Sequence, residues 1–442
     1  MKNKWFVSLL MVVVMMCACW TGAGADEKRK TFTSGDYEYA LLDDGTVEIT
    51  KYKGKAERLA IPDTLDGKRV TAIGEQAFSF CSSLTIISIP DSVAQIGENP
   101  FAACSSLKSI SVSPEHPYFA TIDGVLFRKA DKTLISYPAG ISSSTYTIPQ
   151  GITSIGDSAF SSCDSLTSVS IPDSVTSIGD SAFSYCYFLT SVSIPDSVEQ
   201  IGTNPFAACF ELKSISASPD HPYFATIDGV LFRKADKALI SYPASISSST
   251  YTIPRGITAI GDSAFSSCDS LTSVSIPDSV TSIGDSAFDS CVSLTSVTIP
   301  DSVTSIGNIA FSFCTSLTSI SIPDSVTSIG DGAFYACYSL TIITIPDSVT
   351  SIGDWAFSSC TSLTSITIPD SVTSIGDWAF ASCNFLTSVT IPDSVTSIGD
   401  GAFLMCSSNL TLTVPRNSYA AEYAKTNNIP YTYPDANDWL NN

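Results

Sequence analysis

A cysteine recurs every 23 residues along most of this chain, and that spacing constrains the fold more than any other feature of the sequence. Twelve of the fourteen cysteines follow it, with two gaps of 59 residues that exceed the period by 36. They are Cys81, Cys104, Cys163, Cys186, Cys209, Cys268, Cys291, Cys314, Cys337, Cys360, Cys383 and Cys406. A short tandem unit cannot bury its hydrophobic face alone, so its neighbours must stack on it. We therefore expect one elongated array.

Each unit repeats one pattern of apolar and polar residues, which residues 166–186 illustrate. Val169 and Ile171 alternate with serines, which predicts a short strand with one buried and one hydrated face. Pro172 ends that strand, because it has no N–H to donate. A second extended stretch, a corner at Gly179 and one helical or 3₁₀ turn complete the coil. Stacked coils predict a β-rich solenoid with a parallel sheet, rising ~4.8 Å per coil.

The spacing Leu166-x-x-Val169-x-Ile171 matches the opening of the leucine-rich repeat, whose period is about 20 to 29 residues. Ser174 stands where that template has Asn or Cys, so the usual asparagine ladder is absent. With the recurring IPDSVTSIGDxAF, the pattern resembles the BspA-like, Treponema pallidum-type leucine-rich repeat family over about residues 37–433. The resemblance implies a bacterial surface or secreted adhesin.

The array is expected to occupy the middle of the chain, between two caps. Residues 26–68 are assigned to an N-terminal cap, 69–408 to the solenoid of twelve units, and 409–442 to a C-terminal cap. Two 36-residue inserts, 113–148 and 218–253, are near copies of each other. Each holds two strand patterns around a short turn, which predicts a larger coil with a protruding hairpin.

Residues 1–25 have the features of a signal peptide. Two lysines precede an uncharged run of 16 residues, which is shorter than a membrane span of ~20. Ala23-Gly24-Ala25 then offers a cleavage site before Asp26. A partial lipobox indicates lipoprotein processing at Cys19 as the alternative. We expect a secreted or cell-surface protein with no transmembrane span in the mature chain.

The charge and the motifs exclude several functions. A net charge of -21 argues against nucleic-acid binding, which depends on clustered Lys and Arg. Gly-Asp-Ser tripeptides resemble a serine-protease motif, but they recur as corners of the coil. The only histidines, His116 and His221, occupy equivalent points of the two inserts, so no Ser-His-Asp triad is expected. We predict no enzymatic activity and no cofactor.

The cysteines and aspartates form rows that favour a structural role. Buried thiols are the preferred interpretation, while disulfides and a metal site remain alternatives. The structural ladder comprises Cys163, Cys186, Cys209, Cys268, Cys291, Cys314, Cys337, Cys360, Cys383 and Cys406. Two rows of aspartates, one starting at Asp173 and one at Asp180, are interpreted as solvated edges and corner caps rather than calcium ligands.

Departures from the repeat are the candidate binding residues. Trp355 and Trp378 replace the serine after Gly-Asp in consecutive coils, either as an exposed aromatic anchor or as packing over the adjacent alanines. The inserts add basic residues to an acidic protein, which either meet an acidic partner or keep an edge soluble. These residues are Arg128, Lys129, Arg233 and Lys234.

The exposed strand face is an uncharged array of Ser and Thr, which is compatible with sugars, a flat peptide or ice. The leading hypothesis is an exported, non-catalytic leucine-rich-repeat protein that mediates protein or glycan binding. The family resemblance implies attachment to host matrix proteins or other cells as the partners. The alternative is a structural or ice-binding hydroxyl surface without a macromolecular receptor. The oligomeric state stays open.

Overall fold

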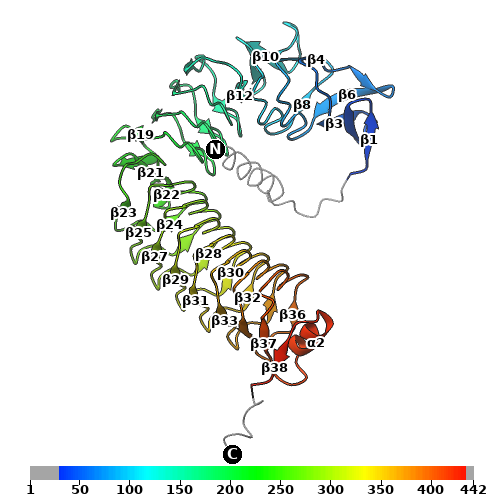
Figure 1. Cartoon of the computed structure of the whole chain (residues 1–442). Coiled ribbons are helices and arrows are strands. Elements are labelled where there is room, and N and C mark those ends of the chain that lie inside the picture. Colours follow the sequence, from blue (N-terminus) through cyan, green and yellow to red (C-terminus); the bar gives the residue numbers. More distant parts are fainter. Residues whose placement is uncertain (1–28, 435–442) are drawn as a thin grey trace, which may run out of the picture.

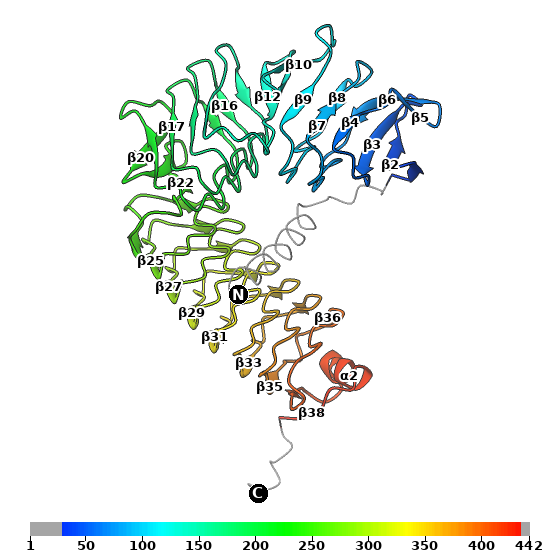
Figure 2. The same cartoon turned by 45° about the horizontal axis from the view of Figure 1, so that its top comes forward.

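The structure, a computed structural model, describes residues 29–434 as a curved, parallel-stranded solenoid (Figures 1 and 2). Strands follow one another around the curve from β1 (Thr31–Ser34) toward the C-terminal end. There lies α2 (Tyr419–Thr426), the one helix among residues 29–434. The β-rich solenoid fold expected from the repeat is confirmed. The predicted signal peptide and the last eight residues of the predicted C-terminal cap lie outside the described residues.

Each coil contributes one strand to each of two parallel sheets. In one coil these are β15 (Ser168–Ser170) and β16 (Ser177–Ile178), and in the next β17 (Ser191–Ile194) and β18 (Gln200–Ile201). β15 pairs with β17 and β16 with β18, always in parallel and one repeat apart. Pairing therefore runs between coils, so no coil forms a sheet by itself.

The same two strands recur along the array. First strands also include β4 (Arg58–Ala60), β7 (Ile86–Ser88), β9 (Ser109–Ser111), β13 (Thr145–Thr147), β19 (Ser214–Ala217), β23 (Thr250–Thr252), β25 (Ser273–Ser275), β27 (Ser296–Thr298), β29 (Ser319–Ser321), β31 (Ile342–Thr344), β33 (Ser365–Thr367), β35 (Ser388–Thr390) and β37 (Thr411–Thr413). Second strands also include β6 (Lys68–Ile73), β8 (Gln95–Ile96), β14 (Ser154–Ile155), β24 (Ala259–Ile260), β26 (Ser282–Ile283), β28 (Ser305–Ile306), β30 (Ser328–Ile329), β32 (Ser351–Ile352), β34 (Ser374–Ile375) and β36 (Ser397–Ile398).

Stacked phenylalanines run through the core. Phe265 and Phe288 have ring centroids 4.9 Å apart and planes 7° apart, and the Phe288–Phe311 pair repeats this at 5.1 Å and 4°. These rings are fully buried. Because the repeat places the same side chain at the same point of every coil, each ring covers the next and excludes water between coils.

The third side of the coil is not helical, contrary to the expected helical or 3₁₀ turn. Separate i to i+3 turns close it, with Ser184 N–H donating to Ser181 O and Cys186 N–H to Phe183 O. Ser181 and Tyr185 have φ of +52° and +60°, a left-handed conformation that interrupts any right-handed helix. Alternate N–H groups then point along the array, and Phe183 N–H donates to Pro205 O of the next coil at 2.8 Å.

Each insert contains an antiparallel meander of three strands rather than a protruding hairpin, followed by one strand of the first sheet, β13 or β23. In the first, β10 (Phe119–Ile122), β11 (Val125–Arg128) and β12 (Thr133–Ser136) form an antiparallel meander, and β12 then pairs in parallel with β14. The second insert repeats this with β20 (Phe224–Ile227), β21 (Val230–Arg233) and β22 (Ala238–Ser241). The two predicted strands exist, but the prediction that they protrude is wrong.

The reason is that β11 is buried on both faces. Val125 and Phe127 belong to the hydrophobic cluster of the following coils, whereas Leu126 belongs to that of the preceding coils. A strand without polar alternation needs cover on both sides. Each insert is therefore a two-sided partition, and the core divides into three clusters at the two inserts.

Both ends of the array are covered. At the start, β1 pairs with β2 (Tyr37–Leu41) and β2 with β3 (Val47–Tyr52), both antiparallel, and β5 (Thr64–Leu65) pairs with β6. At the other end, β38 (Tyr431–Thr432) pairs with β37, and the alanines of α2 join the last core cluster. Such covers keep the last coil's apolar face out of water.

The cysteine thiols cross-link coils by hydrogen bonds. Cys186 Sγ donates to Phe160 O at 3.0 Å, and Cys337 Sγ to Phe311 O at 3.2 Å, each time to the preceding coil. Ten of the twelve ladder cysteines are buried, and Cys81 and Cys406 are partly exposed. Burial raises the thiol pKa of Cys163, Cys209 and Cys268, and that of Cys406 to about 11.

We predict that native protein will expose few of these thiols to a thiol reagent, whereas denatured protein will release nearly all twelve. Burial raises the pKa of Cys163, Cys209, Cys268 and Cys406 in the folded state, so their burial stabilises the folded protein below the unfolded thiol pKa of ~8.5. This contribution to the free energy of unfolding declines as the pH rises through the folded-state pKa values. Thiol titration against pH measures both effects. Mass spectrometry that found most of the twelve in disulfides would contradict the prediction.

Deleting residues 113–148 is predicted to leave a folded solenoid. The deletion joins Val112 to Pro149 and recreates the strand–proline sequence of an ordinary coil at the 23-residue period. As a contrast, Leu126→Asp keeps the insert but buries a carboxylate in the core, and we expect a loss of at least about 2 kcal/mol. Denaturant unfolding followed by circular dichroism compares the two. Loss of cooperative unfolding in the deletion variant would show that the insert is indispensable.

Candidate functional site

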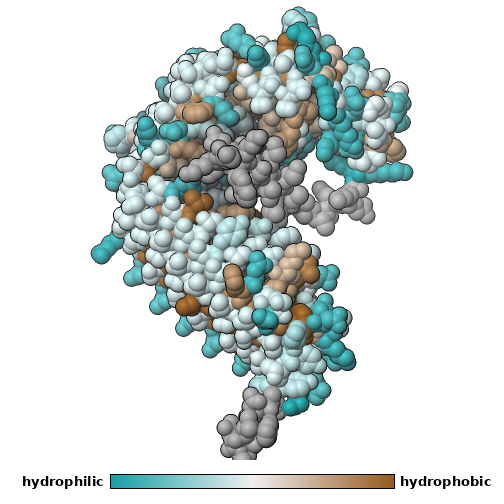
Figure 3. Space-filling model, viewed as in Figure 1, coloured by the Kyte–Doolittle hydropathy of each residue, from teal (hydrophilic) through white to brown (hydrophobic). Residues whose placement is uncertain are grey.

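The outer face of the first sheet is a regular array of hydroxyls. In β27 and β33 the central residue is buried and the flanking Ser and Thr are exposed. Ile342 interrupts the array with a side chain that is 67% exposed. The surface in Figure 3 is mostly pale or teal with separate brown patches, so apolar residues interrupt a largely polar exterior.

Trp355 and Trp378 form a stacked pair on the turn side of the array. Their ring centroids lie 5.7 Å apart with planes at 26°, so the adjacency expected from the repeat is observed. Trp378 is 36% exposed. It packs against Gly401 of the next coil, since a Cβ added to that glycine would lie 3.2 Å from the indole Cδ2. One face of the pair is thus supported, and part of the rings remains accessible.

Two further aromatics extend this pair into a strip over four coils. Tyr335 lies edge-on to Trp355 at 6.3 Å, and Phe313 lies edge-on to Tyr335 at 5.3 Å. We call Phe313, Tyr335, Trp355 and Trp378 the aromatic strip. Sequence reasoning missed the first two, although Tyr335 also replaces a serine of the repeat and that departure was the available signal.

The basic residues of the inserts have internal partners. Arg128 forms an ion pair with Asp131, with 2.8 Å between Nη2 and Oδ2, and its hydrogen bonds lower the Asp131 pKa. Lys129 Nζ donates to His116 O at 2.7 Å. Arg233 and Lys234 repeat both arrangements in the second insert. Their partner-binding role stays a prediction, but these contacts give them a structural role within each insert.

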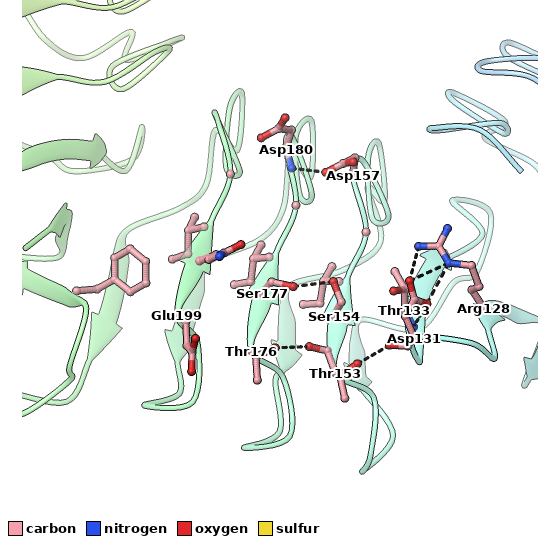
Figure 4. A pocket seen from close by; sticks show the side chains of 18 of the residues that line it. Arg128, Asp131, Thr133, Thr153, Ser154, Asp157, Thr176, Ser177, Asp180 and Glu199 are labelled. Carbon is pink, nitrogen blue, oxygen red and sulfur yellow. Dashed lines mark hydrogen bonds and ion pairs between the residues drawn. The ribbon is translucent and has the colours of Figure 1, made fainter. Parts of the chain in front are cut away.

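A shallow trough lies between the two inserts on the outer face of the second sheet, with a volume of about 730 Å³. Figure 4 shows its floor, where Ser154 and Ser177 hydrogen-bond at 2.7 Å and Arg128 closes one end. Arg233 lines it as well. Its floor hydroxyls are largely paired with one another or with carbonyls, which favours a structural ladder over a ligand site.

The corner aspartates bond to the backbone of the next coil. Asp180 N–H donates to Asp157 Oδ1 at 2.7 Å, and Asp400 N–H donates to Asp377 Oδ1 at the same distance. Each carboxylate therefore caps the following coil rather than a turn of its own. Among residues 29–434, no group of three or more His, Cys, Asp or Glu side chains is placed to hold a metal ion.

Both histidines have structural roles, because their ring nitrogens form hydrogen bonds with the backbone. His116 is fully buried, its Nε2 lies 3.1 Å from Pro90 O, and its Nδ1 accepts the N–H groups of Tyr118 and Phe119. His221 makes the equivalent contacts. Since both ring nitrogens are occupied, neither histidine is available as the base for a corner serine.

Comparison with known proteins identifies the repeat. The model of the BspA type leucine-rich repeat region matches residues 56–145, 136–249, 241–350 and 327–429. A search of curated proteins finds no match. Within the described part of the chain, no helix is both long and apolar enough to span a membrane.

Solved bacterial structures agree with this repeat. A leucine rich cell surface protein from Faecalibacterium prausnitzii is 31% identical, with 90% of this chain and 98% of that chain covered and a TM-score of 0.42. A leucine-rich repeat protein from Eubacterium ventriosum is 24% identical, with 86% and 95% covered and a TM-score of 0.56. The T. pallidum leucine-rich repeat protein is 22% identical, with 65% and 91% covered and a TM-score of 0.24. The chain belongs to the BspA-type leucine-rich repeat family.

Proposed function

We propose that this protein is an exported, non-catalytic surface protein that binds an extracellular protein or glycan on host matrix or other cells. The aromatic strip is the observation that carries the proposal. The similar protein from Faecalibacterium prausnitzii is described as a cell surface protein, which supports the location. The features of residues 1–25 support export in the same way.

The strip has the properties of an interface anchor. Its rings lie on rigid coils, so a partner does not have to order them, and aromatic side chains dominate the binding energy of protein interfaces. The strip extends over four coils and therefore offers an elongated, preorganised aromatic surface.

A second candidate function follows from the hydroxyl array alone. Serine and threonine hydroxyls repeat at one strand spacing over many coils, as in the Ser296–Ser319 pairing of β27 with β29. A structural or ice-binding surface would use that regularity and would need no macromolecular receptor. An ice-recrystallisation assay on the purified protein distinguishes it from the leading proposal.

Reverting Trp355→Ser and Trp378→Ser is predicted to weaken binding without unfolding the protein. Each change restores the usual residue of the repeat, and the loss of an anchor costs ~2 kcal/mol, or about thirtyfold in affinity. A matrix-protein and glycan array with wild-type protein identifies the ligand, and titration of the variants measures the loss.

The matched control is Phe385→Ser, which removes an aromatic side chain that is 64% exposed in a different row. It should leave affinity within about twofold of wild type, since exposed residues away from the anchor contribute little. Equal affinity of the tryptophan variants and the control for every identified ligand would refute the anchor role.

A further inference from the structure

The two near-copies that contain the inserts differ most visibly at one corner. The copies lie 105 residues apart, and the second carries three aromatics at places where the first has only serine. The second copy has Tyr187, Phe188, Phe210, Glu211 and Ser245 in place of Ser82, Ser83, Ser105, Ser106 and Gly140. The copies also differ elsewhere, but this is the corner where serines are replaced by a cluster of aromatic side chains.

In the structure three of the changed residues, Tyr187, Phe210 and Ser245, line a pocket of about 520 Å³ beside the second insert. Tyr187 and Phe210 stack with centroids 5.3 Å apart and planes at 26°. Phe210 is 36% exposed. The remaining walls are residues 244–247 of the insert, between β22 and β23, together with Ser267, Asp269 and Ser270 of the next coil.

The glycine-to-serine difference bears directly on the space available. A Cβ at Gly140 would lie 2.5 Å from Ser106 C and 2.7 Å from Leu107 N, so the first copy presses this segment against the preceding coil. Ser245 carries that Cβ and still donates its N–H to Leu212 O at 2.8 Å. The second copy therefore accommodates a side chain at the place where the pocket lies.

We propose that this pocket binds a neutral carbohydrate residue, an inference that rests on the proposed binding function and deepens it. A sugar ring has an apolar C–H face, which suits the aromatic stack, and a rim of hydroxyls, which suits serine hydroxyls and a carboxylate acceptor. The lining residues include Ser245, Ser270 and Asp269 but no Lys or Arg. An anionic ligand would meet a carboxylate without a compensating cation.

The test uses the chain as expressed and a panel of neutral hexose and N-acetylhexosamine oligosaccharides, with sialylated and sulfated counterparts. Saturation-transfer NMR identifies binders, and titration calorimetry measures affinity. Phe210→Ser and Tyr187→Ser each install the residue of the first copy, so folding is expected to survive. Each should reduce neutral-oligosaccharide affinity by about tenfold or more, while Phe385→Ser, at an exposed residue outside both the pocket and the aromatic strip, leaves the affinity of a short oligosaccharide unchanged.

A reciprocal variant checks the assignment independently. Ser82→Tyr combined with Ser105→Phe builds the aromatic pair into the first copy and is expected to increase the number of bound oligosaccharides. Absence of neutral-oligosaccharide binding, preference for acidic glycans, or full affinity in Phe210→Ser would overturn the proposal.

If the tryptophan variants lose a macromolecular ligand while Phe210→Ser binds normally, the pocket assignment fails and the proposed function stands. If oligosaccharides bind through Phe210 but no cell or matrix ligand exists, the proposed function fails instead.

Discussion

Hydrogen bonding between successive coils is the interaction on which the rest of the structure depends. Backbone strands pair one repeat apart, and side chains also bond to the backbone of the adjacent coil. Thr190 Oγ1 donates to Thr167 O at 3.0 Å, Ser302 Oγ donates to Val280 O at 2.6 Å, and the cysteine and aspartate rows do likewise. Because the polar groups of these rows find their partners in a neighbouring coil, a change of period leaves a row of unsatisfied groups. The constant spacing is thus a physical requirement.

That requirement also restricts where function can be located. Many threonines, serines and aspartates of a repeated coil hydrogen-bond to a neighbouring coil, as Ser154 and Ser177 do in the trough between the inserts. Binding residues must occupy places where a coil departs from the others without losing a ladder bond. The aromatic strip and the pocket at Tyr187 and Phe210 meet that condition, because their rings replace small polar residues on the turn side.

The inserts show how the array tolerates a break in its period. Each ends one stack of coils and begins another, and β11 supplies apolar side chains to the core clusters on both sides. His116 ties the insert to the preceding coil through Pro90 O. The duplication of the whole block preserved these contacts, whereas the corner containing Tyr187 and Phe210 diverged. This contrast separates residues that maintain the partition from residues that are free to acquire a ligand.

The sequence by itself determined the solenoid, the strand faces and the adjacency of Trp355 and Trp378, because a fixed period places equivalent residues one strand spacing apart. Only the tertiary structure decided the rest. The turn after Asp180 is not helical, since positive φ at Ser181 turns its neighbours' N–H groups toward the next coil. The insert strands do not protrude, because their apolar residues require cover on both faces. The carbohydrate pocket depends on segments 35 and more residues apart, such as Phe210 and Ser245, meeting across the break, which no local pattern specifies.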